Sequence, residues 1–395
     1  MLRPDTTAMT ILLAVLTGLG PLTVDMYLAS MPDIGRALAA SPAQVQLTIS
    51  SYLIGYAIGQ VFYGPLSDRH GRRPVMLAAL TVYVLASFAC AVAPTIELLI
   101  AARFVQAVGG AGAVVLARAV VRDVYEGVRL GRELAVMATI VALAPIAAPL
   151  LGGVLQTLFG WRSNFVLLLL FGIGAVGSVW MLMPETLRTR APEPVSPVSI
   201  LRSYRSFLGH RAFVAHLAIA TAAFLGLFGW ISVSAFVLQD IYGQSPLAFG
   251  LVFAACSSGY MGGTAIAARV VMHWGSDRTM GVGCAAMAAG GLAMSLALTV
   301  GWQLPATLVL GMALFLGGMG MVWPQAQAGA LMPFPDRAGA ASSLMGVVQQ
   351  TSSAAIGALL GHLIGATAWP LALGVGGAGV LALAIWAATR TIRRV

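Results

Sequence analysis

The sequence is 395 residues long, with 59% hydrophobic and only 9% charged residues. A soluble domain carries roughly 25% charged residues, and one or two soluble cores could not bury this much apolar surface. The composition therefore excludes a soluble globular protein and indicates a chain surrounded by lipid. The net charge of +9 arises from 22 arginines, with no lysine, against 13 acidic residues. Because these arginines lie mostly in short gaps between apolar runs, they indicate membrane orientation rather than nucleic-acid binding.

Twelve apolar runs follow one another, each long enough to cross a bilayer as a helix of about 20 residues. Backbone groups in lipid must be paired internally, and the runs are too long and continuous for barrel strands, so we expect helices. No signal-peptide cleavage site follows the first run, so we interpret it as a retained helix. The predicted spans are residues 8–30, 45–65, 74–94, 97–118, 134–158, 163–183, 212–238, 247–272, 280–300, 304–331, 339–364 and 369–389.

One connection is longer than the others and divides the chain near its midpoint. Residues 184–211 are rich in Pro, Ser and Arg, whereas the other connections are only a few residues long. The sequence therefore predicts an all-α integral membrane protein of twelve transmembrane helices. Six lie in an N-terminal bundle, residues 1–183, and six in a C-terminal bundle, residues 212–395, with a cytoplasmic linker between them.

The arginines are divided unequally between the two sides of this topology. With both termini in the cytoplasm, Arg36 and Arg162 lie outside and Arg103 lies within a helix. The positive-inside rule therefore predicts cytoplasmic termini. The cytoplasmic arginines are Arg3, Arg69, Arg72, Arg73, Arg118, Arg122, Arg129, Arg132, Arg188, Arg190, Arg202, Arg205, Arg211, Arg269, Arg278, Arg337, Arg390, Arg393 and Arg394.

The three cysteines, Cys90, Cys256 and Cys284, each lie inside an apolar run and have no metal-like spacing. We interpret them as small buried residues and expect neither a disulfide framework nor a metal site.

The connection between the second and third spans carries the most specific motif, which reads Gly-Pro-Leu-Ser-Asp-Arg-His-Gly-Arg-Arg over residues 64–73. It resembles the G-x-x-x-D-R-x-G-R-R signature of the major facilitator superfamily. We expect the first glycine to allow close helix approach and the second to permit a tight turn. The aspartate can meet an arginine or a helix N-terminus of the neighbouring bundle, which makes a conformational latch. The motif residues are Gly64, Asp68, Arg69, Gly71, Arg72 and Arg73.

The matching connection of the second half, Arg269 to Arg278, keeps a glycine and some charge but not the full motif. We interpret it as the decayed copy expected of parallel repeats.

Two helical segments resemble further motifs of the superfamily. Residues 103–110 resemble its R-x-x-Q-G motif, with Ala107 in place of the first glycine. The predicted fifth span resembles the antiporter motif that ends in G-P-x-x-G-G, although alanine replaces glycine at three positions. A stripe of small residues with a proline kink, as in many helix contacts, is the alternative interpretation. The antiporter-motif residues are Pro145, Ala148, Pro149, Gly152 and Gly153.

The chain also resembles one branch of this superfamily nearly end to end. The first span reads Thr-Val-Asp-Met-Tyr-Leu-Ala-Ser-Met-Pro over residues 23–32, and Ala368-Trp369-Pro370 precedes the last span. These segments are similar to bicyclomycin- and chloramphenicol-resistance exporters of the Bcr/CflA type. The resemblance implies a proton-coupled efflux pump of the bacterial inner membrane, driven by the proton gradient without a cofactor.

Asp25 and Arg103 are the candidate proton-coupling residues. A charge at mid-membrane costs roughly 2.5–3.5 kcal/mol on insertion scales, so such residues are usually functional or paired. Asp25 could carry a proton as its surroundings open and close. Arg103 cannot lose its proton and must find a carboxylate, carbonyls or water. We expect it to be the electrostatic counterpart of Asp25, with structural support of the N-terminal half as the favoured role.

A substrate cavity is expected between the two halves near mid-membrane. Aromatic and methionine side chains adapt to varied apolar ligands, and glutamine offers either a donor or an acceptor. For any one of these residues, ordinary helix packing is the alternative. The candidate cavity residues are Tyr52, Tyr56, Phe224, Phe228, Tyr260, Trp323, Gln327, Met345 and Gln349.

The favoured hypothesis is a monomeric antiporter that exchanges small, largely apolar drugs or antibiotics for protons by alternating access. Export of a natural metabolite, such as an amino acid, is the first alternative, and no residue separates the two. A membrane-embedded lipid-modifying enzyme is the second alternative. It is disfavoured because no loop holds the acidic cluster or paired acid and base that such chemistry needs.

Overall fold

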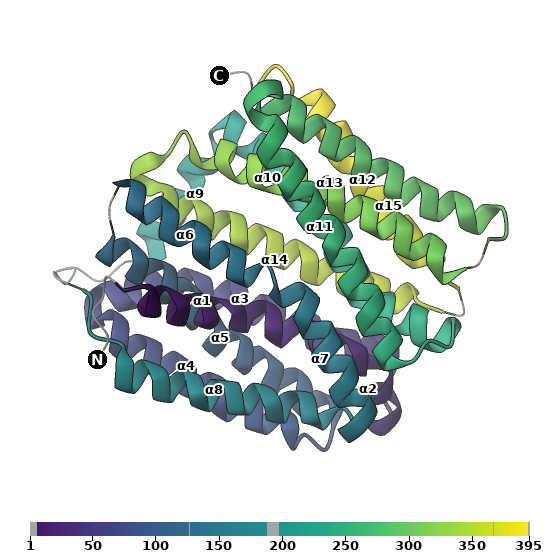
Figure 1. Cartoon of the computed structure of the whole chain (residues 1–395), viewed down its shortest axis with the longest axis horizontal. Coiled ribbons are helices and arrows are strands. Elements are labelled where there is room, and N and C mark those ends of the chain that lie inside the picture. Colours follow the sequence, from purple (N-terminus) through teal and green to yellow (C-terminus); the bar gives the residue numbers. More distant parts are fainter. Residues whose placement is uncertain (1–5, 126, 188–196, 303, 366, 394–395) are drawn as a thin grey trace. The chain divides into compact units, whose positions relative to one another are not determined.

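The computed structural model describes residues 6–125, 127–187, 197–302, 304–365 and 367–393 (Figure 1). The chain divides into two compact units, an N-terminal unit of residues 1–195 and a C-terminal unit of residues 196–395. Within the described residues all regular structure is helical, which confirms the all-α fold class. Part of the predicted linker, residues 188–196, lies outside the described residues, as do Arg3 and Arg394.

The N-terminal unit contains eight α-helices and one short 3-10 helix among its described residues. They are α1 (Thr7–Asp25), η1 (Leu28–Ser30), α2 (Met31–Ala37), α3 (Pro42–His70), α4 (Arg72–Ala91), α5 (Ile96–Val124), α6 (Gly127–Val141), α7 (Ala144–Phe159) and α8 (Arg162–Leu182).

The C-terminal unit contains seven α-helices, a π-helical turn and a 3-10 turn among its described residues. They are α9 (Pro197–Leu208), α10 (Arg211–Phe236), the π-helix η2 (Val237–Ile241), α11 (Pro246–Trp274), α12 (Ser276–Thr299), α13 (Pro305–Leu331), the 3-10 turn η3 (Pro335–Arg337), α14 (Ala338–Leu363) and α15 (Trp369–Ala388).

Local sequence explains where several of these helices begin. Ser41 and Gln44 form a capping box at the start of α3, and Pro42 occupies the first turn, where its missing N–H is not needed. Ser245 and Pro246 repeat the serine cap and the first-turn proline at α11, without a capping box, and the Ser245 hydroxyl accepts from the Ala248 N–H at 3.1 Å. Serine followed by proline therefore marks the same start in the second helix of each predicted bundle.

Each of the twelve predicted spans coincides with helix, but several boundaries were wrong. The first helical segment continues through η1 and α2 to Ala37 rather than ending at residue 30. Twelve residues, or about 18 Å of helical rise, therefore separate Asp25 from the end of the segment. Within the predicted linker, residues 197–208 form helix α9.

Ten helical segments of the described residues are long and apolar enough to cross a membrane. Helices α3 and α14, of 29 and 26 residues, are not among them. Both are long enough to span, at 1.5 Å per residue, but they carry more polar side chains than the others. The number twelve and the cytoplasmic position of the termini stay predictions.

The same packing pattern occurs inside each unit. In the N-terminal unit α5 packs against α1, α3 and α4, and α4 packs against α8. In the C-terminal unit α13 packs against α10, α11 and α12, and α12 packs against α15. Helices in the same order therefore make the same contacts, as expected of a structural repeat.

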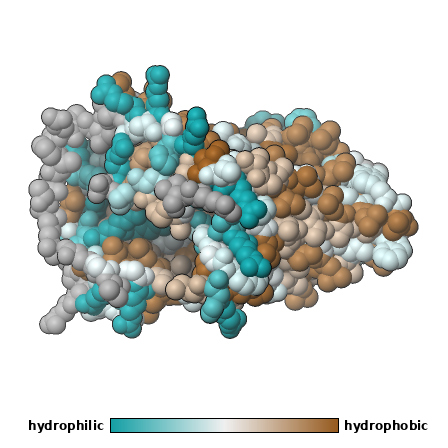
Figure 2. Space-filling model, turned by 90° about the horizontal axis from the view of Figure 1, so that it is seen from above, coloured by the Kyte–Doolittle hydropathy of each residue, from teal (hydrophilic) through white to brown (hydrophobic). Residues whose placement is uncertain are grey.

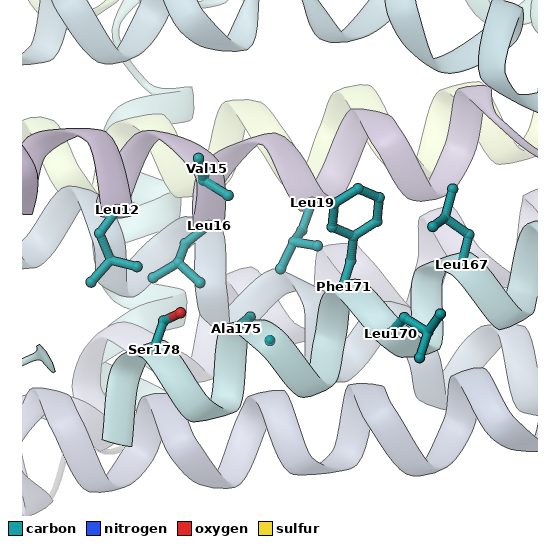
Figure 3. A pocket seen from close by; sticks show the side chains of 10 residues that line it. Leu12, Val15, Leu16, Leu19, Leu167, Leu170, Phe171, Ala175 and Ser178 are labelled. Atoms are coloured by element: carbon teal, nitrogen blue, oxygen red, sulfur yellow. The ribbon is translucent and has the colours of Figure 1, made fainter. Parts of the chain in front are cut away.

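The two units differ in how closely their first and last helices pack. Helices α10 and α15 pack along much of their length, whereas α1 and α8 touch only slightly. Between α1 and α8 lies an open groove of about 300 Å³ (Figure 3). Its lining is apolar except for Ser178, so it offers no charged group.

Large apolar side chains remain exposed on many helices. Leu85 is 64% exposed, Phe159 71% and Leu310 71%. Figure 2 shows one face of the molecule, on which hydrophilic side chains gather at one end and hydrophobic side chains cover much of the rest. A water-soluble monomer rarely exposes such extended apolar surface, so lipid is the solvent of these helices.

The predicted orientation can be tested with single cysteines in the C-terminal unit. In a variant lacking Cys90, Cys256 and Cys284, Ser206→Cys and Thr299→Cys place thiols at exposed positions. With the linker in the cytoplasm, an impermeant maleimide should label Thr299→Cys on intact cells and Ser206→Cys only after permeabilisation. The reversed labelling pattern would contradict the orientation.

Candidate functional site

The predicted latch is built around the Arg72 guanidinium at the start of α4. Its Nη1 atom donates to Asp68 Oδ1 at 2.5 Å and to Ser67 Oγ at 2.6 Å. Its Nε and Nη2 atoms donate to Asp123 on α5, at 2.8 and 3.3 Å. The planar guanidinium thus joins the end of α3 to the end of α5 through a nearly buried fork.

Glu185, which follows α8, completes this assembly. Its carboxylate accepts from the backbone N–H groups of Arg72 at 2.9 Å and Arg73 at 3.2 Å, the first two residues of α4. These N–H groups have no partner within the helix, and the helix dipole favours an anion there. Burial disfavours the charged carboxylate, but four backbone donors outweigh it and lower the pKa of Glu185.

Gly71 is required by this arrangement for two reasons. Its φ angle is +100°, in a region that residues with a Cβ avoid. A Cβ at this position would also lie 2.5 Å from Glu185 Oε2. Glycine is therefore required here for the turn, as expected, and also because the Glu185 carboxylate occupies the space that a side chain would need.

The other latch residues are more open. A Cβ added at Gly64 would meet nothing within 4 Å in the described residues, so the close helix approach expected at Gly64 stays a prediction. Arg73 donates to the Trp180 carbonyl at 2.6 Å, and Arg69 is exposed. Asp68 pairs with Arg72 inside its own unit.

Sequence reasoning assigned no role in the latch to Asp123 or Glu185. Asp123 ends an apolar helix beside Arg122, and Glu185 follows the last helix of its half within Pro184-Glu185-Thr186. An acid directly after an apolar run was the only available signal. The helix start that each carboxylate contacts could not be inferred, because the contacting residues are more than 50 positions apart in the sequence.

Arg103 is fully buried in α5 and has no carboxylate partner among the described residues. Its Nη1 atom donates to Gln106 Oε1 at 2.8 Å and to the Thr23 carbonyl at 3.2 Å. Its guanidinium carbon lies 4.4 Å from the ring centroid of Tyr52 and 4.7 Å from that of Tyr27. Aromatic faces attract a cation most strongly when water is excluded, so these rings help offset the cost of burying the charge.

A network of uncharged polar groups surrounds this cation. Gln106 donates to Ser87 Oγ at 2.8 Å, and the Thr23 hydroxyl lies 2.7 Å from the Tyr83 hydroxyl. The Tyr27 hydroxyl is hydrogen-bonded to Thr48. Arg103 Nε and Nη2 nevertheless have no partner in the described residues. The guanidinium therefore keeps donors for another acceptor.

Asp25 is the last residue of α1 and is buried, with a relative exposure of 6%. No hydrogen bond or ion pair of its carboxylate is present within the described part of the chain. It is two residues beyond Thr23, whose carbonyl accepts from Arg103. The structure thus places Asp25 and Arg103 on segments that touch, but it does not join them in an ion pair.

The antiporter-motif helix packs against the break that follows Asp25. A Cβ on Gly152 of α7 would collide with the carbonyl oxygen of Met26, the first residue after α1. Pro145 lies in the first turn of α7, where it separates α6 from α7, and Pro149 lies within the helix. Ala148 and Gly153 are buried. Gly152 therefore allows α7 to touch the α1 backbone beside Asp25.

Two further hydrogen bonds hold the segment beyond this break. Asn164 of α8 donates to Ser30 Oγ at 2.8 Å, and Gln156 of α7 donates to Asp33. Helices α7 and α8 therefore hold the part of the segment after this break, and α5 contacts the part before it.

The candidate cavity residues fall into separate groups in the two units. Tyr52 and Tyr56 stack in the N-terminal unit, with ring centroids 6.2 Å apart. In the C-terminal unit Phe224 contacts both Phe228 and Trp323, at 5.9 Å in each case. Tyr260 lies on α11, and the buried Met345 and Gln349 lie on α14. A single cavity that includes both groups stays a prediction.

Three of the C-terminal candidates carry buried polar atoms that lack a partner in the described residues. They are Trp323 Nε1, Gln327 Oε1 and Gln349 Nε2. Trp323 and Gln327 are four residues apart on α13 and therefore share a helix face. A buried polar atom without a partner is costly, so these atoms indicate places where a ligand or water could bind.

The loop interpreted as a decayed motif copy holds an ion pair of its own. Asp277, in the first turn of α12, accepts from Arg393 Nη2 at 2.7 Å and Nε at 3.1 Å. Arg393 follows α15, as Glu185 follows α8. The segment after the last helix of each unit therefore binds the start of α4 or α12, through backbone N–H groups in the first case and an ion pair in the second.

The role of Glu185 can be tested by the pH dependence of stability. Its lowered pKa means that its contribution is present above the pKa of an unfolded glutamate and is lost as the pH falls through the folded pKa. Wild-type melting temperature in detergent should therefore fall on acidification from neutral pH. Glu185→Gln should melt slightly lower at neutral pH and lose less on acidification. An unaltered profile in Glu185→Gln, matching that of the exposed control Glu97→Gln, would contradict this role.

Curated relatives resemble this chain over nearly its whole length. It is 34% identical over 358 residues to the uncharacterized MFS-type transporter YdgK of Bacillus subtilis, covering 90% of this chain and 88% of the relative. It is 30% identical over 359 residues to multidrug resistance protein D of Escherichia coli, covering 91% and 90%. It is 30% identical over 373 residues to the bicyclomycin resistance protein homolog of Haemophilus influenzae, covering 94% and 93%.

A solved structure shares the fold. The D-xylose-proton symporter matches with a TM-score of 0.75 and 16% sequence identity, covering 96% of this chain and 98% of that chain. The family model of the Major Facilitator Superfamily matches residues 13–358. The chain therefore belongs to the Major Facilitator Superfamily and is a multi-pass protein of a bacterial inner membrane.

Proposed function

We propose that the chain exports small, largely apolar drugs or antibiotics in exchange for protons by alternating access. Support for drug export comes from relatives whose names refer to multidrug, bicyclomycin and chloramphenicol resistance, the last a 30% identical protein of Pseudomonas aeruginosa. The proposal includes a monomeric transporter rather than an enzyme, with both termini in the cytoplasm.

The observation that carries proton coupling is the burial of Asp25 without a partner. A lone carboxylate in a water-poor site is costly while charged, and binding a proton removes that cost. A cation that approaches it would favour release of the proton. A conformational change that alters these surroundings therefore changes proton binding, which is the requirement for coupling.

Arg103 is suited to be that cation. Its Nε and Nη2 donors have no partner in the described residues, whereas Nη1 is held by Gln106 and Thr23. A carboxylate can accept two parallel bonds from a guanidinium. We propose that movement at the break after α1 brings Asp25 to these donors in another state of the cycle, when its proton is released.

The latch gives the N-terminal unit a rigid cytoplasmic end. Arg72 ties α3 to α5, and Glu185 ties the segment after α8 to α4. Helices joined in this way would move together, which is the rigid-body motion that alternating access requires. This role differs from the sequence hypothesis, in which Asp68 reaches the neighbouring bundle.

The C-terminal unit offers the groups that suit a neutral substrate. Phe224, Phe228 and Trp323 present apolar rings, and Trp323 Nε1 and Gln327 Oε1 are a donor and an acceptor without partners in the described part of the unit. An apolar surface with a few hydrogen-bonding groups is the usual character of a small-molecule site.

Export of a natural metabolite, such as an amino acid, remains the second candidate, because drugs and metabolites can use the same uncharged groups. Transport of both substrate classes by proteoliposomes under an imposed pH gradient separates them. A lipid-modifying enzyme finds no support in the transporter relatives.

Proton coupling is tested by Asp25→Asn, which has nearly the volume of the wild-type side chain and mimics its protonated form. Substrate-induced proton release from the purified protein should be nearly abolished, because the variant carboxamide cannot exchange a proton. Substrate binding and downhill exchange should survive, whereas accumulation against a gradient should fail.

The matched control for this experiment is Glu97→Gln, which alters an exposed carboxylate in the first turn of α5. It should release protons as the wild type does. Equal proton release from wild type and Asp25→Asn would rule out Asp25, and loss of release in Glu97→Gln would assign the proton to Glu97.

The substrate site is tested by Gln327→Leu, which removes an acceptor from α13 at similar volume. Loss of one hydrogen bond of about 1 kcal/mol should weaken substrate binding about fivefold. The control is Gln325→Leu on the same helix, since Gln325 accepts from Ser276 at 3.1 Å instead. Binding measured by calorimetry should be weakened only by Gln327→Leu, and equal affinities in the two variants would reject this site.

A further inference from the structure

Helix α9, in the segment predicted to be a linker, docks on the C-terminal unit with one of its faces. Phe207 is fully buried, and its ring lies 4.8 Å from Phe334 and 5.8 Å from Phe213, between centroids. The Tyr204 hydroxyl is 3.0 Å from the hydroxyl of Ser343 on α14. These contacts fix the rotation of α9 about its own axis.

A second apolar stripe of α9 remains uncovered. Leu201 is 70% exposed and Leu208 is 51% exposed. They are seven residues apart and therefore lie on one side of the helix. The sequence Pro-Val-Ser-Ile-Leu-Arg-Ser-Tyr-Arg-Ser-Phe-Leu over residues 197–208 places Arg205 beside this stripe and Arg202 about 100° around the helix from Leu201, and it contains no acidic residue.

Chain connectivity places this stripe close to the membrane. Only Gly209 and His210 separate α9 from the apolar segment Arg211–Ile241. Three consecutive Cα steps span at most about 11 Å, so Leu208 lies within that distance of Arg211. Leu208 therefore lies close to the start of a segment that is long and apolar enough to span a membrane.

We propose that α9 is an amphipathic helix that binds the anionic lipid surface of the membrane. Leu201 and Leu208 enter the boundary between headgroups and acyl chains, and Arg202 and Arg205 bind lipid phosphates. A guanidinium matches phosphate oxygens through paired N–H donors. Helices with an apolar stripe flanked by basic residues bind interfaces in this way, with the apolar face about 5–10 Å deep.

Through α9, the charge of the lipid surface would influence the position of the transport helices. Arg337, which ends η3 directly before α14, lies with its guanidinium carbon 5.1 Å from the Phe207 ring centroid and donates to Ser206 Oγ at 3.4 Å. Anionic lipid that draws α9 toward the membrane therefore acts on the starts of α10 and α14. The inference does not depend on the transported substrate.

Spin labels on α9 test the proposal. In full-length protein lacking the three native cysteines, labels are placed by Leu201→Cys, Leu208→Cys and Ser206→Cys. Ser206 is the control, because it is exposed and lies on the side of α9 away from the two leucines. Vesicles of phosphatidylcholine with and without phosphatidylglycerol are compared. Labels at Leu201 and Leu208 should be accessible to oxygen and shielded from a nickel chelate, more so with phosphatidylglycerol, and the label at Ser206 should show the reverse.

Arginine variants test the electrostatic part. Arg202→Gln combined with Arg205→Gln should remove most of the effect of phosphatidylglycerol on the two leucine positions, whereas the exposed Arg390→Gln should keep it. Nickel accessibility of both leucine labels in both vesicles would overturn the proposal. Shielding from oxygen and nickel alike would indicate a protein cover instead, and an undiminished lipid effect in the double variant would reject the role of the arginines.

Discussion

A guanidinium buried in a membrane protein is costly unless the protein surrounds it with suitable groups, and the contacts of Arg103 organise the N-terminal unit although only its Nη1 atom has hydrogen-bond partners in the described residues. Its partners come from four helices: Thr23 and Tyr27 flank the end of α1, Tyr52 is on α3, Gln106 is on α5 and Phe165 on α8. Carbonyl, amide and ring faces lower the cost of burial without neutralising the charge. The cation therefore stays available to a carboxylate.

Chain periodicity and composition were sufficient to predict the helices, because lipid allows no unpaired backbone. The boundaries failed where helices bend rather than end: Asp25 is followed by a turn and two short helices, and Pro145 separates α6 from α7. Arg103 could be predicted as a buried structural cation from its position in an apolar run. Tyr27 and Phe165 could not be assigned to it, since that contact depends on how distant helices pack.

The latch motif shows the same limit of sequence-based prediction within a single turn of the chain. Its glycine, acid and arginines are local in sequence, so the turn at Gly71 could be predicted. The space around Gly71 is occupied by Glu185, more than 100 residues later, and Arg72 divides its donors between Asp68 and Asp123. A motif identifies the residues that cooperate within one turn. The partners that complete its chemistry follow from tertiary structure alone.

The two units have one packing pattern but different chemistry. In the N-terminal unit the buried interior holds Arg103 and Asp25, and α1 is interrupted next to Gly152 of α7. In the C-terminal unit the corresponding first helix, α10, remains regular to Phe236 and packs closely on α15, and Gln349 and Ser353 are buried polar residues of α14. A duplicated fold can separate two tasks in this way, because a charge that must change its partner needs a flexible helix. A site that recognises neutral groups needs helices that stay in place. Under the proposed function, the broken first helix would serve proton transfer and the regular one substrate recognition.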